Sequence, residues 1–343
     1  MRRGARHSPQ NRFDPLNHEY ESIIAPDMAQ AQYILVKPSS IVNKIESPDL
    51  PIVYSMNPYA GCEHGCIYCY ARNSHEYWGY SGGIEFETRI LVKENAPELL
   101  RKTLMQPSWK PSPIMLAGNT DCYQPIEKKY GITRKLLEIL LEFRHPVCII
   151  TKSALILRDL DILQGLAALN LVHVYLSLTT LNEKLRQVLE PRAASGARRL
   201  EVIRRLRDAG IPTGIMLAPV IPGLNDTEIV EILHKAAEAG AQTASYTIVR
   251  LNGVIAEVFE VWLREKFPNQ ADRILHLIAA CHGGKLNDSR WGERLQGKGP
   301  IALTIERVFQ AAFMRYFRNA VPMPPYELSL FRRGGQPDLF TAS

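Results

Sequence analysis

Apolar runs are short throughout this sequence, and none approaches the roughly eighteen residues that a membrane-spanning helix requires. The first residues are basic and polar, so they lack the apolar segment of a secretory signal peptide. Cysteines are few as well, six in 343 residues. Because three of them stand close together, we do not expect a disulfide framework, and we expect a protein of the reducing cytoplasm.

Neither sign of charge is in large excess. The formal net charge of +6 permits a nucleic acid or another anionic partner without requiring one. We expect one large domain with three parts. Residues 1–45 would be a basic, largely flexible leader that packs loosely, with a phosphate-contacting arm as the alternative. Residues 46–320 would form the core with C-terminal helices, and residues 321–343 a proline-rich linker and tail.

Cys62, Cys66 and Cys69 lie in one short stretch with C-x3-C-x2-C spacing. Gly61 and Gly65 flank the first gap, so a tight loop can direct the three thiolates toward one metal centre. Thiolates suit iron–sulfur clusters or zinc. A [4Fe–4S] cluster usually has four cysteine ligands, and no fourth lies nearby. One iron would therefore keep an open position, as catalytic metal sites do.

With Tyr68 in the aromatic position, this loop resembles the C-x3-C-x-aromatic-C signature of the radical S-adenosylmethionine (SAM) superfamily. The resemblance implies a [4Fe–4S] cluster on Cys62, Cys66 and Cys69, chelation of the open iron by SAM, and reductive cleavage of SAM to a 5′-deoxyadenosyl radical. It also implies an electron donor of the flavodoxin or ferredoxin type. The alternative is a zinc knuckle with His64 as fourth ligand, but such sites usually combine two separate ligand turns. We therefore expect His64 to face solvent.

Apolar runs and helical patterns alternate along most of the chain. The predicted strands cover residues 51–56, 113–118, 147–151, 172–178, 213–217 and 243–249. The predicted helices between them cover residues 95–105, 133–143, 159–169, 197–209 and 226–239. This order predicts an α/β fold with a parallel sheet. It resembles the open (β/α)6 partial TIM-type barrel of the radical SAM superfamily, followed here by a C-terminal helical extension, with the active site at the carboxyl ends of the strands.

Polar residues at these strand ends are the candidates for binding SAM. Together with the aromatic residue of the cysteine loop, they are Tyr68, Asn119, Thr120, Asp121, Lys152, Ser177 and Arg192. The three residues after the second strand offer acceptors for the SAM ammonium group. The lysine, the serine and the arginine suit its carboxylate or ribose. The alternatives are a polar turn that caps the sheet for residues 119–121 and an ordinary surface position for the lysine.

Over residues 50–315 the chain resembles the family of spore photoproduct lyase and its uncharacterised bacterial relatives. The shared segments are residues 57–59, 120–127, 218–223 and 288–294. The resemblance implies a lyase that repairs a thymine dimer by hydrogen abstraction, after which a cysteine returns a hydrogen atom. Cys122 lies in the loop of that donor, although its flanking residues differ. The alternative for Cys122 is a small buried residue that packs under the cofactor.

Two further segments suggest partners. Basic residues interleave with Trp291 in residues 282–298, which suits phosphates and a stacked base, although a solvated surface loop would look the same. Residues 327–331 and 336–340 resemble the short peptide with which bacterial repair proteins bind the sliding clamp. The alternative is that their Leu-Phe pairs pack on the domain.

These patterns together predict a radical SAM enzyme that acts on nucleic acid, as a lyase that repairs a DNA lesion. Radical SAM chemistry on RNA, a peptide or a small molecule is the second possibility. A metal-stabilised binding module is the non-catalytic one.

Overall fold

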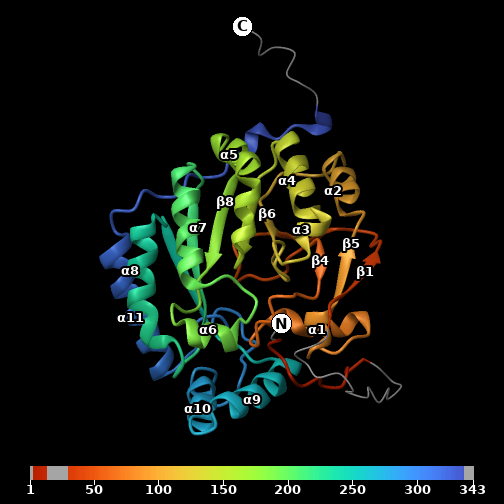
Figure 1. The fold of residues 1–343 in the computed structure, drawn as a ribbon. Coiled ribbons are helices and arrows are strands. Elements are labelled where there is room, and N and C mark those ends of the chain that lie inside the picture. The colour runs from red at the N-terminus through yellow and green to blue at the C-terminus, as the bar shows by residue number, and fades with distance from the viewer. Residues whose placement is uncertain (1–2, 14–29, 336–343) are drawn as a thin grey trace.

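The computed structural model describes residues 3–13 and 30–335, and Figure 1 shows how their elements are arranged. At the centre is a seven-stranded sheet in the order β10-β9-β8-β7-β6-β3-β2. Six strands run parallel, and the edge strand β2 is antiparallel to β3. The strands are β2 (Val42–Lys44), β3 (Tyr54–Met56), β6 (Ile114–Leu116), β7 (Val147–Thr151), β8 (Val172–Ser177), β9 (Thr213–Val220) and β10 (Thr243–Ile248).

The six parallel strands are the six that the sequence predicted, and they follow one another across the sheet in chain order. The predicted α/β fold with an open parallel sheet is therefore confirmed. Strand β6 ends earlier than predicted because Ala117 has a φ angle of 72°, which extended backbone does not adopt. Strand β9 continues three residues further than predicted.

Helices connect the strands and cover the sheet (Figure 1). They are α1 (Glu85–Thr88), α2 (Ala96–Leu104), α3 (Glu127–Tyr130), α4 (Ile132–Glu142), α5 (Leu160–Ala168), α6 (Glu183–Leu189), α7 (Gly196–Asp208) and α8 (Ile229–Ala239). On α4, Leu136, Leu137 and Leu140 are fully buried on one side, as the predicted apolar stripe requires. Burying each such leucine stabilises the fold by about 2 kcal/mol relative to exposure.

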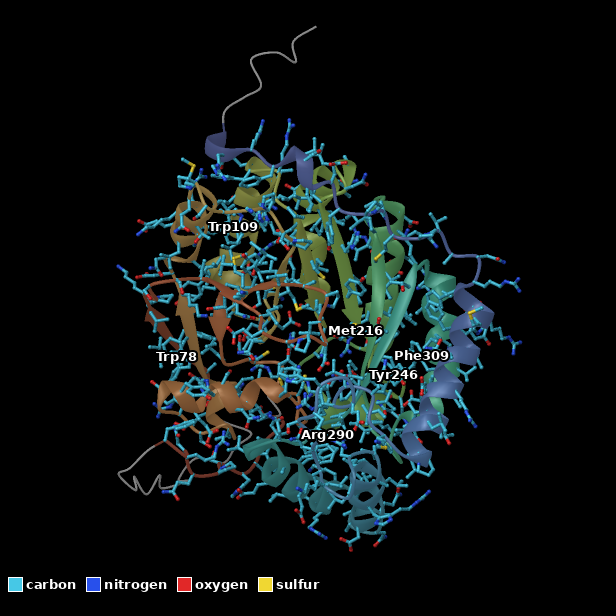
Figure 2. The ribbon with its side chains drawn as sticks, turned by 180° about the vertical axis from the view of Figure 1, so that it is seen from behind. Trp78, Trp109, Met216, Tyr246, Arg290 and Phe309 are labelled. Atoms are coloured by element: carbon cyan, nitrogen blue, oxygen red, sulfur yellow. The ribbon has the colours of Figure 1, made fainter. Side chains whose placement is uncertain are left out.

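The C-terminal helical extension consists of α9 (Val254–Lys266), α10 (Ala271–Ala280) and α11 (Pro300–Phe317). Helix α11 lies against α8 and β10. Figure 2 shows Phe309 of α11 beside Tyr246 of β10, with ring centroids 4.6 Å apart. His234 of α8 stacks on Tyr316 at 4.7 Å. None of the described helices has the length and apolar character needed to cross a bilayer.

A second, three-stranded sheet was not predicted. Strand β1 (Gln32–Val36) is parallel to β5 (Arg89–Lys93), and β5 is antiparallel to β4 (Tyr59–Ala60). Residues 3–13 also pack closely on the core, where Ala5 is fully buried. The described parts of the expected leader are therefore more ordered in their packing than the sequence indicated, and residues 14–29 lie outside the described residues.

The segment 321–335 lies along the amino ends of β7 and β8. The Tyr326 ring stacks on His173 with centroids 4.1 Å apart, and its hydroxyl donates to the Val147 carbonyl at 3.3 Å. Phe331 packs against the main core, edge-on to His145 at 5.6 Å. The tail thus covers the edge of the sheet opposite the strands' carboxyl ends.

This packing corrects the sliding-clamp prediction for residues 327–331. Their Leu-Phe pair lies on the domain, which was the alternative, because Phe331 gains more by covering the core than by remaining in water. The second near-match, residues 336–340, lies outside the described residues.

Candidate metal centre

Cys62, Cys66 and Cys69 are free thiols on the loop that follows β4. Cys62 and Cys66 are buried, and Cys69 is partly buried. Burial raises the pKa of all three thiols, that of Cys66 to about 12, where the nearby Glu190 carboxylate adds to the effect. Burial therefore disfavours the bare thiolates, and the thiolates that bind a metal would need its positive charge to offset their own. The donor set fits an iron–sulfur cluster.

The shape of the loop depends on the two glycines noted in the sequence. Gly61 and Gly65 have φ angles of 77° and 68°. A methyl group on Gly65 would stand 2.7 Å from the Glu87 carboxylate, and one on Gly61 would stand 2.8 Å from the Arg89 carbonyl oxygen. Both positions therefore require glycine for conformation and for space.

A lone metal ion is a poorer match than a cluster. Within residues 3–13 and 30–335, no three His, Cys, Asp or Glu side chains converge closely enough to hold one ion. A [4Fe–4S] cluster has no such requirement, because each cysteine binds a different iron of the cluster.

The segment 120–127 braces the cysteine loop. The Thr120 hydroxyl donates to the Tyr59 carbonyl at 2.7 Å. Gln124 is fully buried; its amide donates to the Gly61 carbonyl at 3.0 Å and accepts from the Glu63 backbone N–H at 2.9 Å. Sequence reasoning noted this segment as shared with relatives but assigned no such role to Gln124. Its two contacts fix the backbone on both sides of Cys62.

Asp121 joins this brace to the third strand. Its carboxylate accepts from the Thr151 hydroxyl at 2.7 Å and the Lys152 backbone N–H at 2.8 Å, and lies 3.3 Å from His64 Nδ1. Burial opposes its ionisation, but His64 and these hydrogen bonds hold the pKa of Asp121 at about 2. The expectation that His64 faces solvent is wrong: it is 3% exposed, because the aspartate satisfies its ring nitrogen. The Nδ1 atom of His64 is thereby turned to a carboxylate.

A buried network that the sequence did not predict lies under Tyr68. Its hydroxyl donates to the Glu190 carboxylate and lies 3.2 Å from the Thr179 hydroxyl. Glu190 pairs with Arg199, and both are essentially inaccessible. Burial disfavours the ionised carboxylate, yet Arg199 and Lys152 hold the pKa of Glu190 at about 2. The sequence offered one indication of this network. A buried tyrosine hydroxyl needs a hydrogen-bond partner, and Glu190 lies two residues before Arg192, which the sequence analysis had selected as a SAM-binding candidate.

Three predicted SAM-binding residues keep polar atoms for a ligand. Within the described chain, the Lys152 ammonium, the Ser177 hydroxyl and the Asn119 side-chain carbonyl have no hydrogen-bond partner. The ammonium lies 5.8 Å from the centre of the Tyr68 ring. Burial lowers the pKa of Lys152, but Cys66 and the Glu190 carboxylate outweigh it, so the group is held as a cation.

The other predicted contacts are engaged with protein groups. Arg192 pairs with Glu63 of the cysteine loop at 3.0 Å, although its Nη1 is buried and has no hydrogen-bond partner among the described residues. Cys122 is fully buried in the main core, and its carbonyl accepts from the Thr133 hydroxyl at 2.6 Å. That position suits packing, the alternative for Cys122, and its hydrogen-donor role stays a prediction.

The basic segment 282–298 is largely neutralised. The pairs are Arg290 with Asp288 and Glu293, Lys298 with Glu293, and Arg294 with Asp49. Trp291 is half exposed, and the Arg294 guanidinium lies 3.8 Å from the centre of its ring. Figure 2 places Arg290 at the end of the molecule where α9 and α10 lie. The segment therefore presents the half-exposed ring of Trp291, while Arg290, Arg294 and Lys298 are paired with carboxylates.

The model of the Radical SAM superfamily matches residues 56–236. An uncharacterised protein of Mycobacterium tuberculosis is 33% identical over 259 residues, which cover 75% of this chain and 76% of that protein. A radical SAM Nalpha-GlyT isomerase of Pseudomonas phage M6 is 28% identical over 186 residues, covering 53% of this chain and 36% of the isomerase.

Among solved structures the chain is similar to spore photoproduct lyase. The lyase complexed with dinucleoside spore photoproduct gives a TM-score of 0.61 at 15% identity, covering 85% of this chain and 82% of the lyase. A lyase variant with bound AdoMet and the same dinucleoside gives 0.58 at 16% identity, with the same coverage of both chains. At this identity the likeness shows a shared fold.

Proposed function

Because the chain belongs to the radical SAM superfamily, we propose that it is a lyase-type enzyme that repairs a lesion in DNA. The superfamily uses a [4Fe–4S] cluster and SAM, which when bound supply a 5′-deoxyadenosyl radical that abstracts a hydrogen atom. The observation that carries the enzymatic part is the set of three free cysteines, two buried and one partly buried, on a loop braced by Thr120 and Gln124. Three thiolates on such a cluster leave one iron for SAM.

We assign separate residues to the cluster and to SAM. Cys62, Cys66 and Cys69 would hold the cluster. Lys152 and Ser177 would bind the anionic and hydroxyl groups of SAM, because among the described residues neither the Lys152 ammonium, held beside a carboxylate, nor the Ser177 hydroxyl has a hydrogen-bond partner. A charge-assisted hydrogen bond of this kind contributes about 1.5–3 kcal/mol.

Asn119, Tyr68 and Arg192 complete the proposed SAM site, with Thr120 and Asp121 acting through the loop that they brace. The Asn119 carbonyl can accept from the SAM ammonium group, since its amide already donates to Ser74 at 2.8 Å. The Tyr68 ring is fixed by its hydroxyl and can pack against the adenine. Arg192 would bind the SAM carboxylate through its Nη1 atom, because its Nη2 atom is paired with Glu63.

Two observations support a nucleic-acid substrate. The first is the likeness in fold to a lyase whose structure contains a dinucleoside photoproduct. The second is Trp291, whose ring is braced by Arg294 and half exposed, as a base-stacking platform requires. Since most cations nearby are paired, we expect binding to depend on stacking more than on phosphate contacts.

The test is anaerobic product analysis. The reconstituted protein is incubated with SAM, a reductant and UV-irradiated DNA, and the products are separated by chromatography with mass detection. We expect 5′-deoxyadenosine together with repaired dinucleotides, and neither from Cys66→Ala, which should also lose the four irons per chain. Parallel reactions contain RNA, a peptide mixture and undamaged DNA. Cleavage of SAM with no change in irradiated DNA, or a product in another arm, would refute the DNA-repair proposal.

A further inference from the structure

The segment that follows α10, residues 285–298, joins the two edges of the main sheet. On one side it lies against the edge strand β10, where the Ile248 backbone N–H donates to the Leu295 carbonyl at 2.8 Å. On the other side it reaches the loop between β2 and β3, where the Asp49 carboxylate accepts from the Gly292 backbone N–H at 2.7 Å. Strands β10 and β2 are the two ends of the described sheet, so this bridging segment connects edges that strand pairing leaves open.

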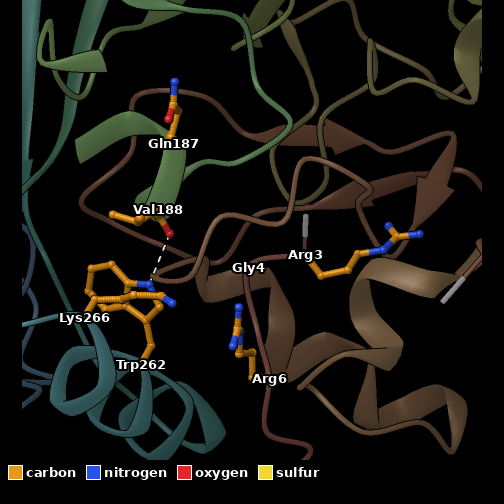
Figure 3. A pocket seen from close by; sticks show the side chains of 7 residues that line it. All are labelled: Arg3, Gly4, Arg6, Gln187, Val188, Trp262 and Lys266. Carbon is orange, nitrogen blue, oxygen red and sulfur yellow. Dashed lines mark hydrogen bonds between the residues drawn. The ribbon is translucent and has the colours of Figure 1, made fainter. Parts of the chain in front are cut away.

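Trp291 is the exposed aromatic residue of the bridging segment. It is 53% exposed, the highest fraction among the four tryptophans. The Arg294 guanidinium lies over its ring, and the Asp49 carboxylate holds that guanidinium in place. Trp262, which lines a small pocket beside α6 (Figure 3), is by contrast 3% exposed, and its indole N–H donates to the Val188 carbonyl at 3.1 Å. Trp291 thus combines a fixed ring with a face that is open to a stacking partner.

Arg250, two residues beyond the carboxyl end of β10, differs from the arginines of the bridging segment. Arg290 and Arg294 are each paired with a carboxylate. Arg250 forms no ion pair among the described residues: its Nε atom donates to the Asn287 side-chain carbonyl at 3.2 Å, and its two terminal nitrogens have no described hydrogen-bond partner. Burial and the nearby Arg294 lower the pKa of Arg250, but an arginine remains a cation at any physiological pH. Its guanidinium therefore keeps donors for an anionic ligand.

The other charges around Arg250 nearly balance. Asp49 and Asp288 are the carboxylates that act on it, and each is already paired with an arginine of the bridging segment. Lys285 and Glu46 are exposed, carry opposite charges and form no ion pair within the described parts of the chain. The surface therefore offers one guanidinium beside one aromatic face and no broad positive field. A nucleotide matches this combination, because it carries a planar base and a phosphate one sugar apart.

We propose that Trp291 and Arg250 form a nucleotide subsite, in which a base displaced from the DNA stack lies on the open face of Trp291 and an adjoining phosphate binds the Arg250 guanidinium. A base inside a duplex has both faces covered by its neighbours, so the subsite takes a single-stranded or flipped-out nucleotide. Arg250 follows a parallel strand, so the subsite lies at the edge of the sheet that also carries the proposed SAM site. The inference rests on the DNA substrate proposed above and assigns its base and phosphate contacts to two residues.

The experiment measures binding of a fluorescein-labelled single-stranded DNA of roughly twelve nucleotides to the reconstituted full-length protein, by anisotropy at several salt concentrations. On a single strand each phosphate contact contributes about 0.7 to the slope of log K against log salt. We expect Arg250→Gln to reduce the slope by about this amount and Arg250→Lys to restore it. Trp291→Ala should weaken binding roughly 5- to 150-fold at an unchanged slope, and Trp291→Phe should keep most of the affinity. With a duplex of the same sequence, Trp291→Ala should have no effect.

The matched control is Arg307→Gln, the same charge change at an exposed arginine of α11. It should bind with the affinity and slope of the wild type, and circular dichroism checks that every variant is folded. Three outcomes would overturn the inference: an unchanged slope in Arg250→Gln, an equal loss of slope in Arg307→Gln, or wild-type affinity in Trp291→Ala. Any of these with DNA still bound by the wild type would leave the repair proposal standing, whereas a wild type that binds no DNA would remove both.

Discussion

Lys152 directly follows the third parallel strand, with its ammonium group among the side chains of Tyr68, Glu190 and Cys66. The sequence placed it there because residues that follow parallel strands gather at one edge of the sheet. What the sequence did not provide was Glu190, which holds the lysine charged and Tyr68 in place. Glu190 is close to Lys152 only through packing of distant segments, and no local pattern encodes that contact.

We predict that Lys152→Met weakens SAM binding and leaves the cluster intact. The methionine fills a similar volume, while the lost charged contact is worth about 1.5–3 kcal/mol, or roughly a 10- to 100-fold rise in Kd. Equilibrium dialysis of SAM with the reconstituted protein measures the affinity, and iron analysis checks the cluster. An unchanged Kd would remove Lys152 from the SAM site.

Cys122 gives a second test at this scale. Because the thiol is fully buried in the main core, we expect Cys122→Ala to lower the free energy of unfolding by about 1 kcal/mol and to leave SAM cleavage unchanged. Denaturant unfolding and 5′-deoxyadenosine assays measure the two quantities. An altered product spectrum in this variant would instead establish Cys122 as the hydrogen donor.

At the scale of elements, the strands of the main sheet were predictable because each is an apolar run bounded by turn residues. The small sheet was not predicted. Strand β4 has only two residues, too few for a pattern. Strand β1 has the β-forming run QYILV, but it lies within the residues expected to form a flexible leader. The packing of residues 3–13 could not be predicted either, because their contacts with Glu87, Glu76 and α9 join residues that are 60 or more positions apart in the chain.

The fit between the N-terminal segment and the cysteine loop predicts that Gly4→Val destabilises the cluster. The Glu87 carboxylate accepts from the backbone N–H groups of Gly4 and Ala5 at 2.8 and 2.7 Å and from Arg72 at 2.6 Å. A side chain on Gly4 would force this contact apart at a cost of about 1–3 kcal/mol.

The measurement is the loss of cluster absorbance after mixing with aerated buffer, which should be faster for Gly4→Val than for the wild type. Phe13→Ala, at an exposed position of the same segment, is the control. Equal decay of all three proteins would show that the segment does not protect the loop.

On the scale of the whole molecule, the tail joins the amino edge of the sheet to α4 and β8. We predict that Phe331→Ala lowers the free energy of unfolding by about 1–3 kcal/mol, less than for a fully buried phenylalanine, because Phe331 is only partly covered. Thermal unfolding measures the change, with Leu328→Ala at a more exposed position as control. A melting temperature equal to that of the wild type would mean that the tail contributes nothing to the domain.

Helix α9, which packs in the same buried cluster as Cys66, is synthesised after the cysteine loop. Residues 3–6 and the loop are synthesised early, whereas α9, with Trp262 and Lys266, follows Glu87 by some 180 residues. At about 5–20 residues per second, the loop emerges from the ribosome roughly 10–40 s before that helix is complete. Throughout this interval the loop lacks the α9 side chains that pack with Cys66 in the finished protein.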